Sequence, residues 1–258
     1  MNNNFSQWLL SFLSESDLDS SSSLIVHSSF KRLSNLSIAA EEVCEILASS
    51  VPKGCLLMPT MSWKTVNKNA PNFFYHDTKS HTGILTEIFR KKFAESRSLH
   101  PTHSVAALGT NAIILTQEHH LSTTPCSKSS PYGLIENSPL RENCFILFID
   151  VALESCTYIH YFEEQFSKSN YLEPEVEHYI LHDINNIPYE YNLFKHNKKA
   201  RDFHQFGRLL KRNNNLYHSQ YNNCNFILLK ASNLSDTVKS RFEISLDATL
   251  AFQSYQFG

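Results

Sequence analysis

The stretch CFILFIDV, residues 144–151, decides the fold, because it is almost entirely apolar and rich in aromatic and β-branched side chains. A continuous run of this kind predicts a buried β-strand. Shorter apolar runs predict further strands at residues 24–26, 55–58, 103–108 and 226–229.

Helices are predicted between these strands. Apolar residues at helical spacing predict four of them, at residues 38–51, 83–93, 111–119 and 158–166. Strands that alternate with helices favour an α/β fold, here with a central mixed or largely antiparallel sheet flanked by helices. Residues 1–23 form an amphipathic N-terminal helix in this prediction, since no basic segment of a signal peptide precedes their apolar residues.

The remaining segments show weaker patterns. Residues 59–81 are irregular and aromatic, residues 127–133 are rich in turn formers, and residues 167–223 are polar without a clear period. Residues 237–252 are expected to close the domain. Because the sequence contains no internal repeat and no long linker, all 258 residues are predicted to form a single domain.

Composition excludes several classes of protein. Hydrophobic residues make up 41% and charged residues 19%, as in soluble globular proteins, and the formal net charge is −2. A general nucleic-acid binder needs a basic excess, and a membrane span needs roughly 20 apolar residues, so neither partner is expected. Six cysteines without paired spacing predict reduced thiols in a cytoplasmic protein. A homodimer is compatible with the sequence.

Four polar clusters stand at the ends of predicted strands or in the loops beside them, where α/β proteins tend to bind ligands. They are residues 27–29 (HSS), 97–104 (RSLHPTHS), 130–133 (SPYG) and 157–160 (TYIH). Free N–H groups and hydroxyls at Ser28 and Ser29 can hold a phosphate or carboxylate, or one of these serines simply caps a helix. Lys31 adds positive charge nearby.

The second and fourth clusters carry groups suited to binding and proton transfer. Arg97 can pair with a phosphate through its planar guanidinium. His100 and His103 have the spacing of a metal pair, but Pro101 disfavours a helix that carries both, so no metal site is predicted. His160 is a candidate general base, with Glu154, Glu163 and Glu164 near enough in sequence to orient it, although this cluster taken alone favours a structural role.

Taken together and in order, these clusters resemble the aminoglycoside 3-N-acetyltransferase family. The matching text is LIVHSSFKRL, KGCLLMPTMSW, GILTEIFRKKFAESRSLHPTHSVAALG, SSPYGLI and CFILFIDVALESCTYIHYFEE, over about residues 24–164. The block RSLHPTHSVAALG is its most specific part. The family often has glycine where this chain has Ser34 and Asp150.

The resemblance implies an N-acetyltransferase that uses acetyl-CoA as acyl donor and no metal, with an α/β fold distinct from the GNAT fold. It implies that residues 24–164 form the coenzyme-binding and catalytic core, and residues 165–258 are then the substrate side and C-terminal part. On the coenzyme side we expect Ser28, Ser29, Lys31, Arg97, Ser98, His100 and Ser104. The catalytic residues it implies are His160, with Thr157 beside it, and His27, while Glu163 matches the HxxE position and is expected to meet a cationic substrate.

Three alternatives remain open at this point. Cys156 is placed to act as a nucleophile with His160 as base, in a ping-pong reaction. The chain could instead be a non-catalytic coenzyme A-binding protein. The acceptor amine could belong to an aminoglycoside, whose positive charges call for carboxylates such as those of Glu163, Glu164, Glu173, Glu175 and Glu177. A nucleotide-linked amino sugar of surface polysaccharide synthesis would instead favour the basic residues at 196–201 or 208–212.

Overall fold

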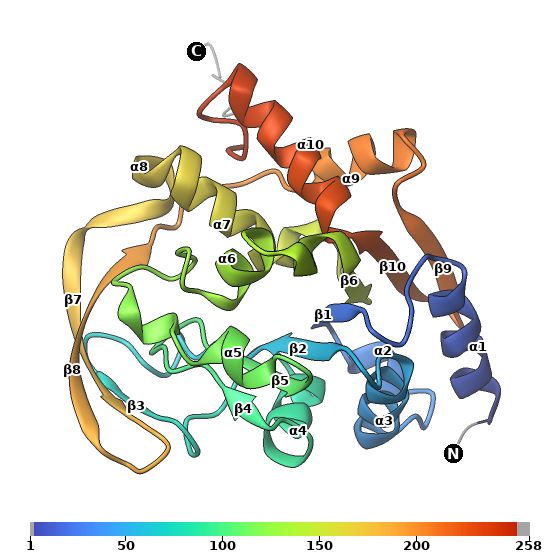
Figure 1. Ribbon diagram of the computed structural model, residues 1–258, viewed down its shortest axis with the longest axis horizontal. Coiled ribbons are helices and arrows are strands. Elements are labelled where there is room, and N and C mark those ends of the chain that lie inside the picture. The colour runs from blue at the N-terminus through green and yellow to red at the C-terminus, as the bar shows by residue number, and fades with distance from the viewer. Residues whose placement is uncertain (1–2, 252–258) are drawn as a thin grey trace.

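The computed structural model describes residues 3–251. A mixed sheet of seven strands runs through the molecule in the order β4-β5-β2-β1-β6-β10-β9 (Figure 1). The strands are β1 (Ser23–Ser28), β2 (Cys55–Pro59), β4 (Ser96–Arg97), β5 (Val105–Gly109), β6 (Cys144–Ile149), β9 (Tyr217–Tyr221) and β10 (Cys224–Lys230). The central strands β2, β1 and β6 are parallel. Antiparallel strands extend the sheet on both sides.

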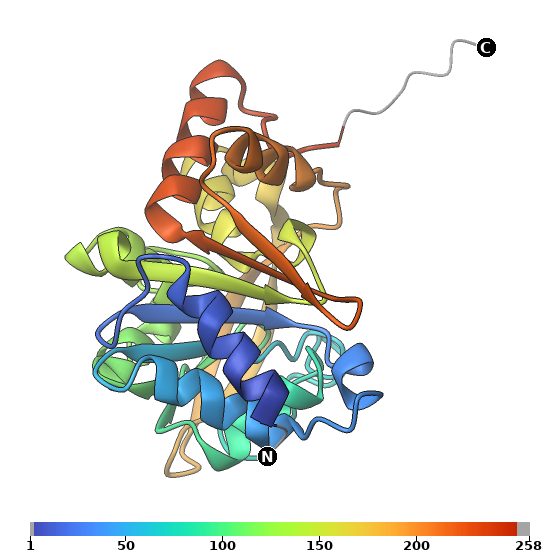
Figure 2. The ribbon, with the colours of Figure 1, turned by 90° about the vertical axis from the view of Figure 1, so that its right-hand side faces the viewer.

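Helices cover both faces of this sheet (Figures 1 and 2). They are α1 (Asn3–Ser14), α2 (Lys31–Ser34), α3 (Ala40–Ser50), α4 (Ile84–Lys92), α5 (Ala112–Thr116), α6 (Pro131–Glu136), α7 (Thr157–Phe166), α8 (Lys168–Tyr171), α9 (His204–Arg212) and α10 (Ala231–Ile244). Short 3₁₀ turns lie at His119–Leu121, Pro139–Asn143 and Leu153–Ser155.

Alternation along the strands creates two separate cores. Ile146 and Phe148 of β6 face α6, α7, α9 and α10, whereas Leu147 and Ile149 face α1, α3 and α4. Because successive strand residues point to opposite faces, a strand covered on both sides must be apolar throughout. This explains why all six residues of β6 are buried and why CFILFIDV is the clearest strand signal in the chain.

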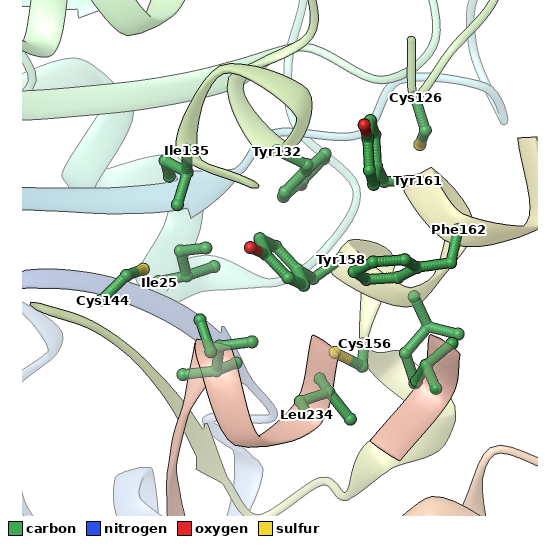
Figure 3. Close-up of a cluster of buried hydrophobic side chains, with 14 of the residues drawn as sticks. Ile25, Cys126, Tyr132, Ile135, Cys144, Cys156, Tyr158, Tyr161, Phe162 and Leu234 are labelled. Carbon is green, nitrogen blue, oxygen red and sulfur yellow. The ribbon is translucent and has the colours of Figure 1, made fainter. Parts of the chain in front are cut away.

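Helix α7 is anchored in the first of these cores. Tyr158 and Phe162 point from α7 into a cluster that also contains Tyr132 of α6 and Leu234 of α10 (Figure 3). The Tyr158 hydroxyl donates a hydrogen bond of 2.7 Å to the buried carboxylate of Glu136. These contacts fix the helix, so residues on its other face hold a defined position.

A second sheet of three strands, β3 (Asn72–Phe74), β7 (Leu172–His182) and β8 (Pro188–His196), lies at one end of the molecule (Figure 1). Its inner face buries Phe73, Tyr179, Leu181 and Leu193, and Leu99 packs against them. The β7–β8 hairpin therefore covers the segment that follows Arg97, and its last residue, His196, returns toward the main sheet.

The predicted α/β architecture with a mixed central sheet flanked by helices is confirmed. The β7–β8 hairpin was missed, since the polar residues 167–223 have one solvent-facing side and lack a continuous apolar run. Helix α6 begins at Pro131, inside the predicted loop. The predicted closing segment runs instead as α10 from Ala231, and its expected end, Phe252, lies outside the described residues. Within residues 3–251, no helix has the length and apolarity that crossing a membrane requires.

Candidate active site

A cavity of about 420 Å³ opens where the parallel strands β1, β2 and β6 end. Parallel strands present their carboxyl ends at one edge of the sheet, and ligand sites form there in α/β proteins. The lining residues come from these strand ends, from the loops and the 3₁₀ turn beside them, and from α4, α7 and β8: Val26, His27, Ser28, Pro59, Met61, Trp63, Thr82, Thr86, His103, Val151, Glu154, Ser155, Thr157, His160 and His196. A smaller cavity of about 230 Å³ shares Glu154, His160 and His196 with it.

His160 stands at the junction of the two cavities and is held from behind by a carboxylate. Its Nδ1 lies 2.5 Å from Oε2 of Glu163, one turn further along α7. His160 keeps 19% of its side chain exposed, whereas Glu163 is fully buried. Residues three apart on a helix face the same way, so this pairing follows from the HxxE spacing. With Nδ1 engaged, Nε2 is the ring nitrogen left for a ligand.

Arg201 completes this group from a distant part of the sequence. Its Nε donates to both carboxylate oxygens of Glu163, at 2.8 and 3.0 Å. Burial alone would raise the pKa of Glu163, but His160 and Arg201 outweigh burial and hold that pKa below its usual range. Glu163 is therefore an anion that orients the imidazole. Because it is fully buried, the Glu163 carboxylate is not among the groups that line the cavity.

Aromatic packing fixes the plane of the His160 ring. The ring stacks on Tyr171, with centroids 5.1 Å apart, and meets the edge of Phe203 at 5.2 Å. Both aromatic side chains are buried. The imidazole is thus held in one orientation by packing as well as by its hydrogen bond.

The other histidines of the cavity are neutral. Burial, followed by the nearby His160, lowers the pKa of His27 and of His196 to about 3. Burial also holds the pKa of His103 well below its usual range. His27 stacks on Phe148 of the neighbouring strand, with centroids 5.3 Å apart, and its Nε2 has no hydrogen-bond partner among the described residues. A buried neutral imidazole with a free nitrogen is suited to bind a polar ligand atom.

Two of the expected residues with hydroxyl groups also line the cavity. Thr157 begins α7, and Ser28 ends β1. The Ser28 hydroxyl has no partner within the described part of the chain. Ser29 lies just beyond, and its N–H donates to the carbonyl of Ile149, which leaves that N–H unavailable to a ligand.

Arg97, Ser98, His100 and Ser104, which the family resemblance implies for the coenzyme side, do not line this cavity. Arg97 is 4% exposed, and its NH1 donates to the carbonyls of Tyr75 and Thr78 at 2.9 and 2.7 Å. Ser104 accepts from Arg97 Nε at 3.0 Å. The Arg97 side chain is therefore engaged inside the protein, where it joins the loop that carries Tyr75 and Thr78 to Ser104.

Ser98 and His100 are interior as well. The Ser98 hydroxyl bonds His119 Nδ1 at 2.8 Å, and His100 Nδ1 accepts the N–H of His103 at 2.9 Å. Since both side chains are fully buried, they do not present a surface to a coenzyme in this structure. Their role here is to shape the loop that carries His103 to the cavity.

Lys31 is exposed on α2, near the end of β1. Its neighbour Arg32 pairs with Asp150, with NH1 2.7 Å from Oδ1. Asp150 has the left-handed backbone conformation, with φ of 55°, which favours glycine. The chain therefore keeps the turn after β6 without glycine, and the carboxylate holds Arg32 against that turn.

Cys156 is not placed to act as a nucleophile. Its side chain is fully buried, and burial raises the pKa of its thiol to about 12. A thiol of that pKa is protonated at neutral pH, whereas the thiolate is the reactive form. Burial and this raised pKa argue against the ping-pong alternative through Cys156.

Sequence reasoning missed three features of the site. Trp63 and His196 line the cavity, and Arg201 supports Glu163. His196 and Arg201 follow a hairpin that had not been predicted, so no local pattern pointed to them. The sequence does predict His27, Ser28, Thr157 and His160, which line the cavity, and the HxxE spacing places Glu163 behind His160.

The fold and cavity define an α/β protein with a buried carboxylate–histidine pair at the ends of parallel strands. The chain belongs to the aminoglycoside 3-N-acetyltransferase family, since the sequence model of that family matches residues 25–243. This confirms the family resemblance. No curated protein sequence matches the chain.

Solved structures share the fold at low identity. The apoenzyme of aminoglycoside acetyltransferase AAC(3)-IVa is 20% identical, with a TM-score of 0.74 over 96% of this chain and 91% of that one. YokD from Bacillus subtilis is 19% identical, with a TM-score of 0.71 over 92% of each chain. AAC-IIIb bound to CoASH is 15% identical, with a TM-score of 0.73 over 93% of this chain and 96% of that one.

Proposed function

We propose that this protein transfers an acetyl group from acetyl-CoA to an amino group of an amino sugar or aminoglycoside, with His160 as general base. The observation that carries the proposal is the Nδ1 contact of His160 with buried Glu163, beside a cavity at the strand ends. Membership of an acetyltransferase family supports the reaction class. Relatives of the same fold have been solved with CoASH, a gentamicin and sisomicin.

The reaction needs a base because an alkylammonium group has no lone pair with which to attack a thioester. Neutral His160, with its Nδ1–H donated to Glu163, accepts the proton of the amine through Nε2. The amine nitrogen bonds to the thioester carbonyl carbon, and the resulting tetrahedral intermediate expels the coenzyme thiolate. The nitrogen then loses its second proton to solvent, and the thiolate takes up the proton held by His160, which returns the imidazole to its neutral form. No acyl-enzyme forms.

Glu163 and Arg201 support this step without touching the substrate. The Glu163 carboxylate fixes the ring tautomer and stabilises the imidazolium that forms when His160 takes the proton. Arg201 balances the buried negative charge of Glu163 when His160 is neutral. The pair thus keeps the base in one orientation throughout the cycle.

Neighbouring groups of the cavity are suited to the developing oxyanion. The hydroxyls of Ser28 and Thr157 lie at its lining, and neutral His27 has a free nitrogen. Hydrogen-bond donors that are already in position stabilise the negative charge that develops on the thioester carbonyl oxygen in the transition state. Ser28, Ser29 and Lys31 would hold the coenzyme at the end of β1, as the family resemblance implies. All six cysteines are free and buried, which supports a reducing, cytoplasmic setting.

The proposal is tested by incubating the purified protein with acetyl-CoA and a panel of amines. Release of coenzyme A thiol is followed together with the mass of the amine product. We expect thiol release that depends on the amine and matches the N-acetylated product mole for mole. Tight coenzyme A binding without turnover of any amine would instead support the non-catalytic binding protein.

A further inference from the structure

The charged side chains that line the two cavities indicate how many positive charges an acceptor amine can carry. Glu154 is the one carboxylate that lines either cavity of the described residues. It is 49% exposed and already lies 3.5 Å from His204. An aminoglycoside carries several ammonium groups, and electrostatic complementarity requires several carboxylates around them.

The other carboxylates considered for this purpose are engaged elsewhere. Glu163 is buried behind His160. Glu164 is buried too, where it accepts from the hydroxyl of Thr124 and from the N–H of Cys126. Glu177 lies 3.5 Å from Lys195 on the β7–β8 hairpin. Glu173 and Glu175 also belong to β7 and line neither cavity.

Positive charge, by contrast, lies at the mouth of the smaller cavity. Lys198 and Arg201 line it beside Asn197 and Phe203. The guanidinium of Arg201 is balanced by Glu163, so Lys198 is the uncompensated charge among these residues. A polycation bound next to His160 would meet this charge without an equal number of carboxylates.

The remaining lining is neutral. His27, His103 and His196 are uncharged at neutral pH because burial lowers the pKa of each. Met61, Trp63, Val26 and Val151 supply apolar surface. Such a lining suits the body of a sugar with few charges, because apolar and neutral polar groups do not compensate for the desolvation of extra ammonium groups.

From these observations we infer that the acceptor is an amine of low positive charge, such as a sugar with a single amino group, and not a polycationic aminoglycoside. The inference rests on the proposed acetyl transfer and names its substrate class. The reacting ammonium is the one that Glu154 accommodates. An anionic substituent on the same acceptor, as in a nucleotide-linked amino sugar, would lie toward Lys198.

The test compares kcat/KM for a nucleotide-linked 4-amino sugar and for glucosamine with that for gentamicin and apramycin. We expect the better of the two monoamines to exceed both aminoglycosides at least 10-fold. A reversed order would overturn the inference and leave the proposed function standing. If no amine is acetylated faster than in a reaction without enzyme, both the proposed acetyl transfer and this substrate class are refuted.

A charge reversal tests the electrostatic reason independently of turnover. We expect gentamicin to bind the wild-type protein with a Kd above about 100 μM by calorimetry. Lys198→Glu should tighten that binding about 3- to 10-fold, since it replaces a repulsion by an exposed ion pair. Lys211→Glu, on the exposed end of α9, makes the same change in net charge and should leave the Kd within 2-fold. Low-micromolar binding by the wild-type protein, or equal effects of the two variants, would refute the charge argument.

Discussion

Replacing Glu163 by glutamine isolates the contribution of the buried charge behind His160. Glutamine keeps the size of the side chain and one carbonyl oxygen, but it removes the negative charge that two cationic groups share. Hydrogen bonds to charged groups contribute about 1.5–3 kcal/mol and neutral ones about 1 kcal/mol. The imidazolium formed during proton transfer therefore loses about 0.5–2 kcal/mol of stabilisation. Since about 1.4 kcal/mol is a factor of ten in rate, we expect kcat to fall about 2- to 30-fold.

The same change should reduce stability, because Arg201 is only 12% exposed and loses its counter-charge. Leaving a buried charge without its partner costs about 3–5 kcal/mol, and the retained amide oxygen offsets part of this. For a protein of this size, about 1 kcal/mol shifts Tm by 2–4 °C. We therefore expect Tm to fall by about 5–10 °C.

The assay is steady-state kinetics well below the lowered Tm, with the KM of both substrates measured. A positioning residue predicts a fall in kcat with each KM within about 3-fold, because Glu163 does not touch the substrate. Arg201→Met removes the other partner and should lower Tm with a smaller fall in kcat. Glu243→Gln, on the exposed end of α10, is the control for loss of one carboxylate. Equal falls in kcat for Glu163→Gln and Arg201→Met, or a kcat of Glu163→Gln equal to that of the wild type, would refute this reasoning.

Three further predictions concern acid stability, the thiol and the turn after β6. Burial lowers the pKa of four fully buried histidines: His27, His100, His103 and His119. Below about pH 6.5 the unfolded chain binds protons that the folded chain does not. The free energy of unfolding should therefore fall by up to about 1.4 kcal/mol per pH unit for each histidine. Equal free energies of unfolding in urea at pH 7.5 and at pH 5.5 would contradict this. Cys156→Ala should keep kcat within about 3-fold and yield no acetyl adduct in intact-mass spectra, whereas a loss above about 100-fold would return the thiol to the mechanism. Asp150→Gly relieves the left-handed backbone and loses an ion pair in which Arg32 is 56% exposed, so the two effects oppose each other and Tm should stay within about 3 °C. A fall beyond that would show that this ion pair is a major contribution to stability.

Much of the central sheet could be predicted from the sequence. Strand β6 is covered on both faces, and its uninterrupted apolar run follows from that burial. Helix α7 follows it closely, so the neighbourhood of His160 and Glu163 was readable from one short segment. In this segment the local sequence pattern is sufficient to predict where the residues lie in the folded protein.

The far side of the site could not be predicted. Arg201 and His196 reach the cavity only because the β7–β8 hairpin folds back, and that hairpin has alternating, partly exposed residues. The sequence predicts that Arg97 binds a phosphate, but its guanidinium packs over the Phe73 ring and donates to the carbonyls of Tyr75 and Thr78. Whether an arginine serves a ligand or the protein interior depends on long-range packing, which composition and spacing do not encode.

The most direct test of the central claim is the turnover of His160→Ala, set beside His218→Ala, which removes an exposed histidine from the edge strand β9. A positioned base contributes about 10²–10⁴-fold to a rate. We predict that kcat of His160→Ala falls by at least about 100-fold while coenzyme A affinity stays within a few fold, and that His218→Ala matches the wild type. Acetyl transfer by His160→Ala at a rate close to that of His218→Ala would contradict the account.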